Sequence, residues 1–501
     1  MQPDVLFGQA YFLRFDPKLW EAQQPYPPLG TLYAAAVVRA RGHRVGLFDA
    51  MLAQSEAEWA AALDAQRPRV AVLFEDSFNY LSKMCLLRMR EAALTMIDAA
   101  RARGIPIVVA GSDASDHPDI YLDRGAELVI AGEGETTVAD VVDAMTGASA
   151  AAIPAIDGIC YRGIDGRIVR TRSRDIIRDL DALPPPAWDL LDVERYRAVW
   201  RARHGYFSMN IVTTRGCPYH CNWCAKPIYG QRYSARSPEG VASEVAWLKR
   251  TYAPDHLWIA DDIFGLKPGW IETYADLVAA KDAVTPFKCL LRADGVSETA
   301  ARTLARAGCR EAWMGAESGA QDILDAMEKG TRVEQIYAAT RALKDAGIKV
   351  GFFLQFGYPG ETLEHIEKTL QMVRECEPDD IGVSVSYPLP GTPFYDRVRA
   401  QLGSKQNWVD SSDLAMMYRA TYVPEFYRAL HALVHAQFRS RRRGSLRTLA
   451  AAVYHACRIP GLRRSVRRLS RARTVSAPPP PLLLIPVLSQ HAASIPSEQP
   501  H

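Results

Sequence analysis

The chain has 501 residues, 48% of them hydrophobic and 23% charged, and its net charge is +3. This length predicts two or three domains, and the composition is typical of soluble globular proteins. No run approaches the roughly twenty apolar residues of a membrane span, and the first residues do not resemble a secretory signal. Nine cysteines, most without paired spacing, argue against an exported disulfide framework, so we expect a cytoplasmic protein.

Residues 1–150 alternate short apolar strands with helices. The predicted strands are Val5–Phe7, Val45–Phe48, Val70–Phe74, Ile107–Ala110 and Leu128–Ala131. The predicted helices lie near Leu29–Arg41, Glu56–Ala65, Cys85–Arg103 and Thr136–Thr146. Near-continuous apolar strands separated by helices are typical of a parallel sheet covered on both faces. We therefore expect a doubly wound α/β domain of the flavodoxin or Rossmann type.

Residues 151–205 are predicted to form a hairpin and a linker. The hairpin pairs Ile159–Arg162 with Ile168–Arg170 around an Asp-Gly turn, and three consecutive prolines, Pro184 to Pro186, mark the linker. Residues 206–400 then resume the alternation, with strands at Asn210–Thr213, Leu257–Ala260, Lys288–Leu291, Glu311–Met314, Val350–Gln355 and Ile381–Ser386. Six βα units predict a partial TIM-type barrel whose site lies at the carboxyl ends of its strands.

The C-terminal part is predicted to be a helical region at 401–473, followed by a disordered Pro- and Ser-rich tail at 474–501. Twelve arginines and no acidic residue lie between Arg439 and Arg473. A basic amphipathic helix can bind the surface of an anionic membrane, which predicts peripheral contact with the inner face of the membrane. The alternatives are a solvated extension or contact with an acidic patch of the protein itself. No base-reading module accompanies the charge, so we expect no nucleic-acid partner.

Three cysteines, Cys217, Cys221 and Cys224, have the spacing C-x3-C-x2-C and follow the first strand of the predicted barrel. Three thiolates can hold three irons of a cubane iron–sulfur cluster, which leaves the fourth iron open to an external ligand. The alternative is a zinc site completed by His204 or His220. Zinc sites more often pair two C-x2-C knuckles, and this sequence has no second knuckle.

This motif and its place after the first barrel strand resemble the radical S-adenosylmethionine (SAM) superfamily. The resemblance implies that a 4Fe-4S cluster binds SAM at its open iron and cleaves it to a 5′-deoxyadenosyl radical. It also implies SAM contacts at the ends of successive strands, from Asp261, Asp262, Arg292, Glu317, Ser318 and Gln355. Taken singly, such residues are equally typical of turns, of surface salt bridges or, for the two aspartates, of a helix N-cap before Pro268.

The doubly wound domain ahead of the barrel resembles the cobalamin-binding domain of the cobalamin-dependent radical SAM enzymes, and this resemblance covers most of residues 1–400. It implies cobalamin contacts from Gly111, Ser112, Gly132, Glu133, Gly134 and Glu135. Glycines at strand ends let the backbone approach a flat macrocycle. The D-x-H-x-x-G loop is missing, which implies cobalt without a histidine ligand from the protein. The alternative is a degenerate domain that only packs against the barrel.

The Pro-rich phrase from Ser386 to Tyr395 resembles the group of the anaerobic magnesium-protoporphyrin IX monomethyl ester cyclase. The resemblances imply an enzyme that methylates an unactivated carbon of a small-molecule substrate, with an electron donor such as flavodoxin or ferredoxin as partner. Cyclase-like ring formation or oxidation of a tetrapyrrole-like substrate is the alternative reaction. A corrinoid or cluster carrier or sensor without turnover is the alternative from another class, but a carrier would not need an open iron site.

Overall fold

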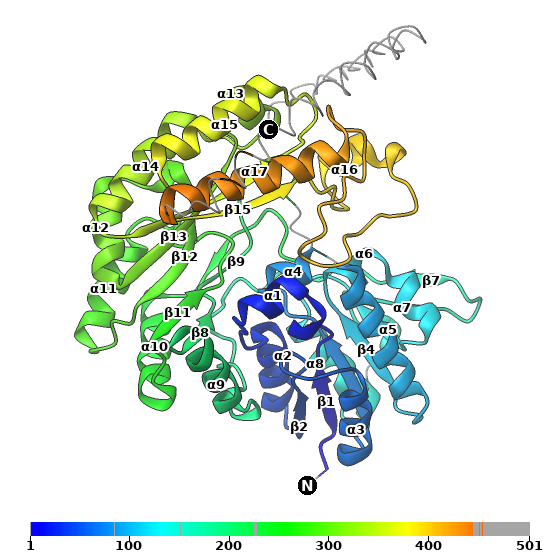
Figure 1. Cartoon of the computed structure of the whole chain (residues 1–501). Helices are drawn as coiled ribbons and strands as arrows, with labels where there is room; N and C mark the ends of the chain where they lie inside the picture. Colours follow the sequence, from blue (N-terminus) through cyan, green and yellow to red (C-terminus); the bar gives the residue numbers. More distant parts are fainter. Residues whose placement is uncertain are drawn as a thin grey trace, which may run out of the picture.

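The computed structural model of the chain describes residues 2–443, apart from 85, 151 and 225–227, together with residues 450 and 453. It has an N-terminal lobe, drawn in blue to cyan, and a second lobe drawn in green to orange (Figure 1). The predicted tail at 474–501 and nearly all of the arginine-rich segment beyond Arg443 lie outside the described residues. Within the described ranges, every helix is too short or too polar to span a bilayer.

The N-terminal lobe is built on a seven-stranded sheet with the order β2-β1-β3-β4-β5-β6-β7. Its strands are β1 (Val5–Gly8), β2 (Val45–Phe48), β3 (Val70–Phe74), β4 (Ile107–Ala110), β5 (Leu128–Ile130), β6 (Ile159–Arg162) and β7 (Ile168–Arg170). The first five are parallel, and β6 and β7 continue the edge in antiparallel fashion. The order 2-1-3-4-5 is that of a flavodoxin-like doubly wound sheet, which confirms the predicted fold.

Helices cover both faces of this sheet because alternate residues of each strand point to opposite sides. Val5 and Phe7 of β1 pack with α2 (Leu29–Ala40) and α8 (Glu135–Thr146). Leu6 packs with the layer of α3 (Ala57–Gln66) and α5 (Leu87–Arg101). The remaining helices of this lobe are α1 (Pro17–Ala22), α4 (Tyr80–Lys83), α6 (Ser112–Asp116) and α7 (Pro118–Arg124). These four helices are short, and the sequence pattern did not predict them.

The second lobe is a partial barrel of six parallel strands in chain order, which confirms the prediction of six βα units. The strands are β8 (Ser208–Ile211), β11 (His256–Ile259), β12 (Phe287–Leu291), β13 (Cys309–Glu317), β14 (Lys349–Phe356) and β15 (Asp380–Val385). The helices between and after them are α10 (Pro238–Tyr252), α11 (Trp270–Ala280), α12 (Glu298–Ala307), α13 (Gln321–Ala326), α14 (Val333–Asp345), α15 (Leu363–Cys376) and α16 (Pro393–Val398). Because β8 and β15 form the two edges of this sheet, the barrel is open.

Residues 151–205 do more than link the two lobes. The predicted hairpin extends the first sheet, and α9 (Val193–His204) lies between the lobes. Trp200 of α9 donates its indole N–H to the carbonyl of Pro25 at 2.7 Å, and Tyr196 donates to Asp49 at 2.7 Å. One hydrophobic core cluster continues from the first sheet into the barrel. The lobes therefore share packed side chains.

Beyond the barrel, residues 402–423 contain no helix, although helices were predicted there. They precede α17 (Pro424–Arg443), which packs against β15 and crosses the barrel lobe in Figure 1. This segment also contacts the N-terminal lobe, because the backbone N–H of Leu87 donates to the carbonyl of Trp408 at 2.8 Å. The C-terminal region thus contacts both lobes.

Candidate cofactor-binding site

Five of the six residues predicted to contact SAM lie buried at one end of the barrel. Asp261 follows β11, Arg292 follows β12, Glu317 ends β13, Ser318 comes next, and Gln355 lies near the end of β14. The carboxyl ends of parallel strands meet at one end of a barrel, so these side chains share one region. The helix N-cap alternative for Asp261 and Asp262 is wrong, because α11 begins at Trp270 and is preceded by Gly269.

Asp261 anchors the start of the cysteine loop. One carboxylate oxygen accepts from the backbone N–H groups of Thr213 and Thr214 at 2.7 and 3.0 Å, and the other accepts from the hydroxyl of Thr213. Burial raises the pKa of Asp261 to about 6, while these hydrogen bonds act in the opposite direction. Asp261 therefore fixes where the loop leaves β8, which is a positioning role.

The cysteine loop carries Cys217 and Cys221 in buried positions and Cys224 in a partly buried one. Within the described ranges, no group of three His, Cys, Asp or Glu side chains is placed closely enough to hold a metal ion. The convergence of the three thiolates on a cluster therefore stays a prediction from their spacing. His204 is engaged elsewhere, since its Nε2 lies 3.1 and 3.0 Å from the carbonyls of Ala22 and Gln23. This contact removes the support for His204 as a zinc ligand.

Arg292 places a fixed cation beside the cysteine loop. Its guanidinium is held by Asp294 at 2.9 and 3.0 Å and lies 3.6 Å from the ring centre of Tyr219. One guanidinium nitrogen lies 3.9 Å from the sulfur of Cys221. A cysteine binds the iron of a cluster as a negatively charged thiolate, and a fixed cation beside it balances that charge. The surroundings of Cys221 thus fit a cluster-binding thiol.

The ends of β13 and β14 add two more polar pairs. Glu317 has a left-handed backbone with φ +57°, and its buried carboxylate accepts from the ammonium of Lys329 at 2.9 Å. Strain of this kind in a non-glycine residue is often found at functional sites. Gln355 donates to the hydroxyl of Ser386 at 2.8 Å. Lys329 in the loop after α13 thus orients Glu317, and Ser386 after β15 orients Gln355.

The carboxyl end of the first sheet contains buried polar atoms without a partner in the described structure. They are Gln9 Nε2, Tyr11 Oη, Glu75 Oε2 and Ser82 Oγ. Unpaired buried polar atoms are rare, and they mark places where a ligand can complete the hydrogen bonding. Burial also raises the pKa of Glu75 to about 8, so this carboxyl is able to donate as well as accept.

The two glycines in the loops after β4 and β5 differ in the room that they leave. A Cβ at Gly111 would lie 2.8 Å from the Cβ of Glu75, whereas a Cβ at Gly132 would meet nothing within 4 Å. Both glycines have positive φ angles, +153° and +83°, which favour glycine. Open space at Gly132, together with unpaired donors and acceptors nearby on β1 and β3, fits the amide-rimmed corrin of cobalamin. Cobalamin contact by Gly111 and Ser112 stays a prediction.

Glu133 and Glu135, which were predicted to contact cobalamin, pair with Arg215 across the lobes. The guanidinium lies 2.5 Å from a Glu133 oxygen and 2.8 Å from a Glu135 oxygen, and all three side chains are at most 4% exposed. Burial and the neighbouring Glu135 raise the pKa of Glu133, although Arg215 acts against this shift. Three rings surround the guanidinium at 5.4 to 5.6 Å, those of Tyr33, Phe78 and Tyr229. We name Arg215, Glu133 and Glu135 the interdomain clamp.

A second ion pair, between Lys83 and Asp262, joins the two lobes. Lys83 of α4 donates to Asp262, just after β11, at 2.6 Å. Asp262 was predicted as a SAM contact, which stays a prediction, and its carboxylate here pairs with the N-terminal lobe. The interdomain clamp and this pair both join strand ends of the barrel to the carboxyl end of the first sheet.

Comparison with known proteins agrees with this architecture. A model of the Radical SAM superfamily matches residues 211–373, and a model of the B12 binding domain matches residues 19–142. An uncharacterized methyltransferase of Pyrococcus horikoshii is 25% identical over 387 residues, which are 76% of this chain and 81% of the relative. The anaerobic magnesium-protoporphyrin IX monomethyl ester cyclase of Rubrivivax gelatinosus is 25% identical over 76% of this chain and 67% of the relative.

Among solved structures, the radical SAM methyltransferase TsrM of Kitasatospora setae, with cobalamin and a [4Fe-4S] cluster bound, matches with a TM-score of 0.63 at 19% identity. The match covers 80% of this chain and 78% of TsrM. The fold and the cysteine loop thus define a radical SAM enzyme with an N-terminal B12-binding domain. The chain combines these two domains in one polypeptide and belongs to the cobalamin-dependent radical SAM enzymes.

Some site residues were missed by sequence reasoning. Arg215 lies two residues before Cys217, and its partners are 82 and 80 positions away, so no local pattern links them. Asn222, between two of the cysteines, donates to the carbonyl of Ala326 at 2.9 Å and thereby fixes the loop. The sequence signals for the Arg215 ion pairs were an arginine two residues before the cysteine motif and two acidic residues in a glycine-rich loop.

Proposed function

We propose that this protein is a methylase that transfers a methyl group to an unactivated carbon of a small-molecule substrate. The observation that carries the proposal is the buried interdomain clamp, because it ties the loop after β5 to the cysteine loop. A methyl carrier and a radical source must act on one substrate, so their binding regions have to be held together. The methyltransferases among the chain's relatives support the same reaction.

When bound, the cluster supplies one electron, SAM supplies adenosyl and methyl groups, and cobalamin supplies a methyl carrier. The residues of this chain bind and orient these groups. We assign Cys217, Cys221 and Cys224 to the cluster, and Asp261 to the position of their loop. Arg292 keeps a positive charge at the barrel centre, where a carboxylate can be held.

We further assign SAM contact to Glu317, Ser318 and Gln355, whose side chains are buried at the strand ends. Cobalamin contact falls to the backbone of the glycine-rich segments 111–112 and 132–135, in which the position of Gly132 is open. In this proposal Asp262, Glu133 and Glu135 act through interdomain ion pairs and position the two regions.

The products formed from SAM test the methylase. In the presence of its substrate, the protein should form S-adenosylhomocysteine and 5′-deoxyadenosine in roughly equal amounts, because one SAM recharges the methyl carrier and a second generates the radical. Quantification of both products by mass spectrometry, together with a substrate mass gain of one methyl group, checks this ratio. Substrate-dependent turnover that yields only 5′-deoxyadenosine, without added methyl mass, would contradict it.

The second candidate is a cyclase-like ring formation or oxidation. It is favoured by the similarity to the cyclase of Rubrivivax gelatinosus, and the Pro-rich turn after β15 resembles that group as well. In this turn Thr392 caps α16 by accepting from the N–H of Tyr395 at 3.0 Å. This contact is a structural one, so the turn alone does not favour cyclisation. The product ratio separates the two reactions.

We propose that a small reduced protein, such as flavodoxin or ferredoxin, donates the electron in the cytoplasm. Cluster thiolates and a low-potential electron both need a reducing compartment. The described residues carry no second cysteine-rich motif for an internal relay, since the remaining cysteines are scattered. An external donor is therefore the simplest source.

We also propose that the arginine-rich segment Arg439–Arg473 binds anionic membranes peripherally, on the strength of its twelve arginines without an acidic residue. The full chain should pellet with phosphatidylserine vesicles at low salt and be released as the ionic strength rises, because screening weakens each contact. A chain truncated before Arg439 should stay in the supernatant. Equal pelleting of both proteins would assign any membrane binding to another surface.

A further inference from the structure

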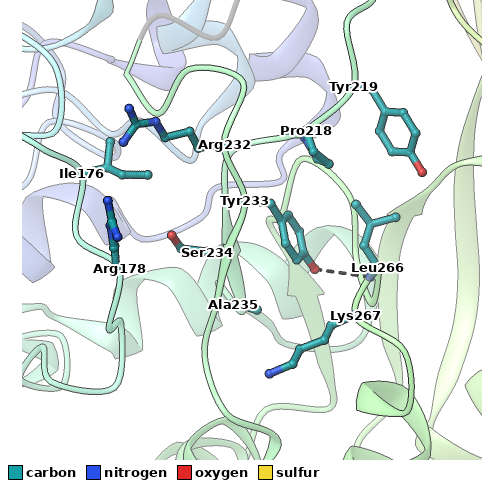
Figure 2. A pocket seen from close by; sticks show the side chains of 10 residues that line it. All are labelled: Ile176, Arg178, Pro218, Tyr219, Arg232, Tyr233, Ser234, Ala235, Leu266 and Lys267. Carbon is teal, nitrogen blue, oxygen red and sulfur yellow. Dashed lines mark hydrogen bonds between the residues drawn. The ribbon is translucent and has the colours of Figure 1, made fainter. Parts of the chain in front are cut away.

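A cavity of about 850 Å³ lies beside the cysteine loop (Figure 2). Four segments line it: 176–178 of the linker, 218–219 of the cysteine loop, 232–235 around β10 (Ser234–Ala235), and 266–267 after β11. Cavities of 300 to 1,000 Å³ are typical of small-molecule sites. We name this cavity the cationic pocket, for the charge described below.

Three basic side chains converge on the cationic pocket from separate segments. They are Arg178, Arg232 and Lys267, and none of the described residues that line the pocket is acidic. In Figure 2, Arg178 and Arg232 lie on one side of Tyr233, while Lys267 lies below it. Three unneutralised cations around one cavity create a positive potential that an anion would relieve.

Two tyrosines, Tyr219 and Tyr233, line the cationic pocket. Tyr219 contacts Arg292 on its far side, at 3.6 Å from the ring centre to the guanidinium carbon. Tyr233 accepts at its hydroxyl from the N–H of Leu266 at 3.3 Å. Their rings offer flat apolar surface to an aromatic or unsaturated molecule.

The position of the pocket is fixed by backbone contacts with the cysteine loop. β9 (Thr214–Arg215) pairs with β10, and a Cβ at Gly216 would lie only 2.2 Å from the carbonyl of Arg232. Gly216 also has φ +78°, a conformation that favours glycine. The close carbonyl of Arg232 and this backbone conformation therefore each require glycine at this position. An occupant of the pocket would therefore lie next to the loop that carries Cys217.

We propose that the cationic pocket binds the acidic end, a carboxylate or a phosphate, of the organic molecule that this protein modifies. This proposal rests on the proposed function, because it assigns the pocket to the substrate of that reaction. An acidic redox protein is the other partner that fits the charge. The volume of the cavity and its tyrosine rings favour a small molecule, since protein docking surfaces are flatter and wetter.

The probe is 1-pyrenebutyrate, a fluorescent aromatic carboxylate, compared with its uncharged amide by fluorescence anisotropy on the cluster-loaded full chain. The carboxylate should bind at least ten times more tightly than the amide, and salt should weaken its binding. Inorganic pyrophosphate and acetate are then compared as competitors of the pyrenebutyrate probe. If pyrophosphate displaces the probe at the lower concentration, the pocket prefers phosphate. If acetate does so, the pocket prefers carboxylate. Either order of displacement supports an anion site.

Charge-removing and charge-keeping variants then locate the binding. The triple variant Arg178→Gln/Arg232→Gln/Lys267→Gln should lose the tenfold preference for the carboxylate. The charge-keeping variant Arg178→Lys/Arg232→Lys/Lys267→Arg should retain it, which excludes misfolding as the cause. A matched control, Arg302→Gln/Arg310→Gln/Lys349→Gln, removes three exposed charges elsewhere on the barrel and should also retain it.

Equal affinity for acid and amide, or an unchanged preference in the first triple variant, would overturn the proposal. A slower reduction of the cluster by reduced flavodoxin in that variant, with pyrenebutyrate binding unchanged, would overturn it in favour of redox-protein docking. These measurements need no turnover. A chain that binds the anion but fails the product-ratio test would therefore refute the methylase and leave the pocket assignment standing.

Discussion

Alanine at Cys217, Cys221 or Cys224 is expected to abolish SAM cleavage, with a loss of at least about a thousandfold in 5′-deoxyadenosine formation. Each thiolate would hold a different iron, so two thiols cannot retain the cluster in the geometry that leaves one iron open. The wild-type chain, reconstituted without oxygen, should hold about four irons and four sulfides per chain. Iron and sulfide analysis together with the visible absorption of the cluster checks this result.

A matched control uses a cysteine outside the loop. Cys376 ends α15 and is 7% exposed, so Cys376→Ala removes a buried thiol without touching the cysteine loop. This variant should keep its iron and its SAM cleavage. Anaerobically purified wild-type protein that holds stoichiometric zinc and no iron would contradict the cluster assignment and restore the zinc alternative.

Most of the strands could be predicted from the sequence because their signal is local. The ranges Val45–Phe48, Val70–Phe74 and Ile107–Ala110 agree with the structure residue by residue, since each is a continuous apolar run between turn-forming residues. The helix α9 was missed because it follows a Pro-rich run and carries five charged residues in its twelve, which resembles a linker. The burial of Tyr196 and Trp200 in α9 appears only once the lobes are assembled.

The placement of the candidate site residues at the strand ends was predictable from the sequence, but the direction of individual carboxylates was not. Asp261, Asp262, Glu133 and Glu135 all lie where a cofactor contact was expected. In the structure, three of them form interdomain ion pairs and the fourth holds the cysteine loop. Their ion-pair partners depend on how the two lobes pack against each other, and this packing cannot be read from a single sequence.

The interdomain clamp leads to a prediction about stability. The variant Arg215→Met should lower the free energy of unfolding by about 3–5 kcal/mol at pH 8, because it leaves two buried carboxylates without their cation. Methyl transfer should fall by roughly tenfold or more, since the cysteine loop loses its contact with the first lobe. Arg39→Met is the matched control, because Arg39 pairs with Asp189 on the surface at 40% and 65% exposure. This control should change stability by less than about 1 kcal/mol.

The pH dependence of Arg215→Met distinguishes loss of an ion pair from loss of packing. Glu133 already has a raised pKa through burial and through Glu135, and removal of the cation should raise it further. A carboxyl whose pKa is higher in the folded state binds protons on folding, so its folded form is favoured at low pH and loses stability as pH rises. The deficit of Arg215→Met should therefore grow between pH 5 and pH 8 in urea unfolding. Adding Glu133→Gln and Glu135→Gln should recover most of the stability and remove the pH dependence, without restoring methyl transfer. A deficit that stays constant with pH, or one that the two amides do not relieve, would show that Arg215 stabilises the interface through its contacts with the three rings rather than through charge.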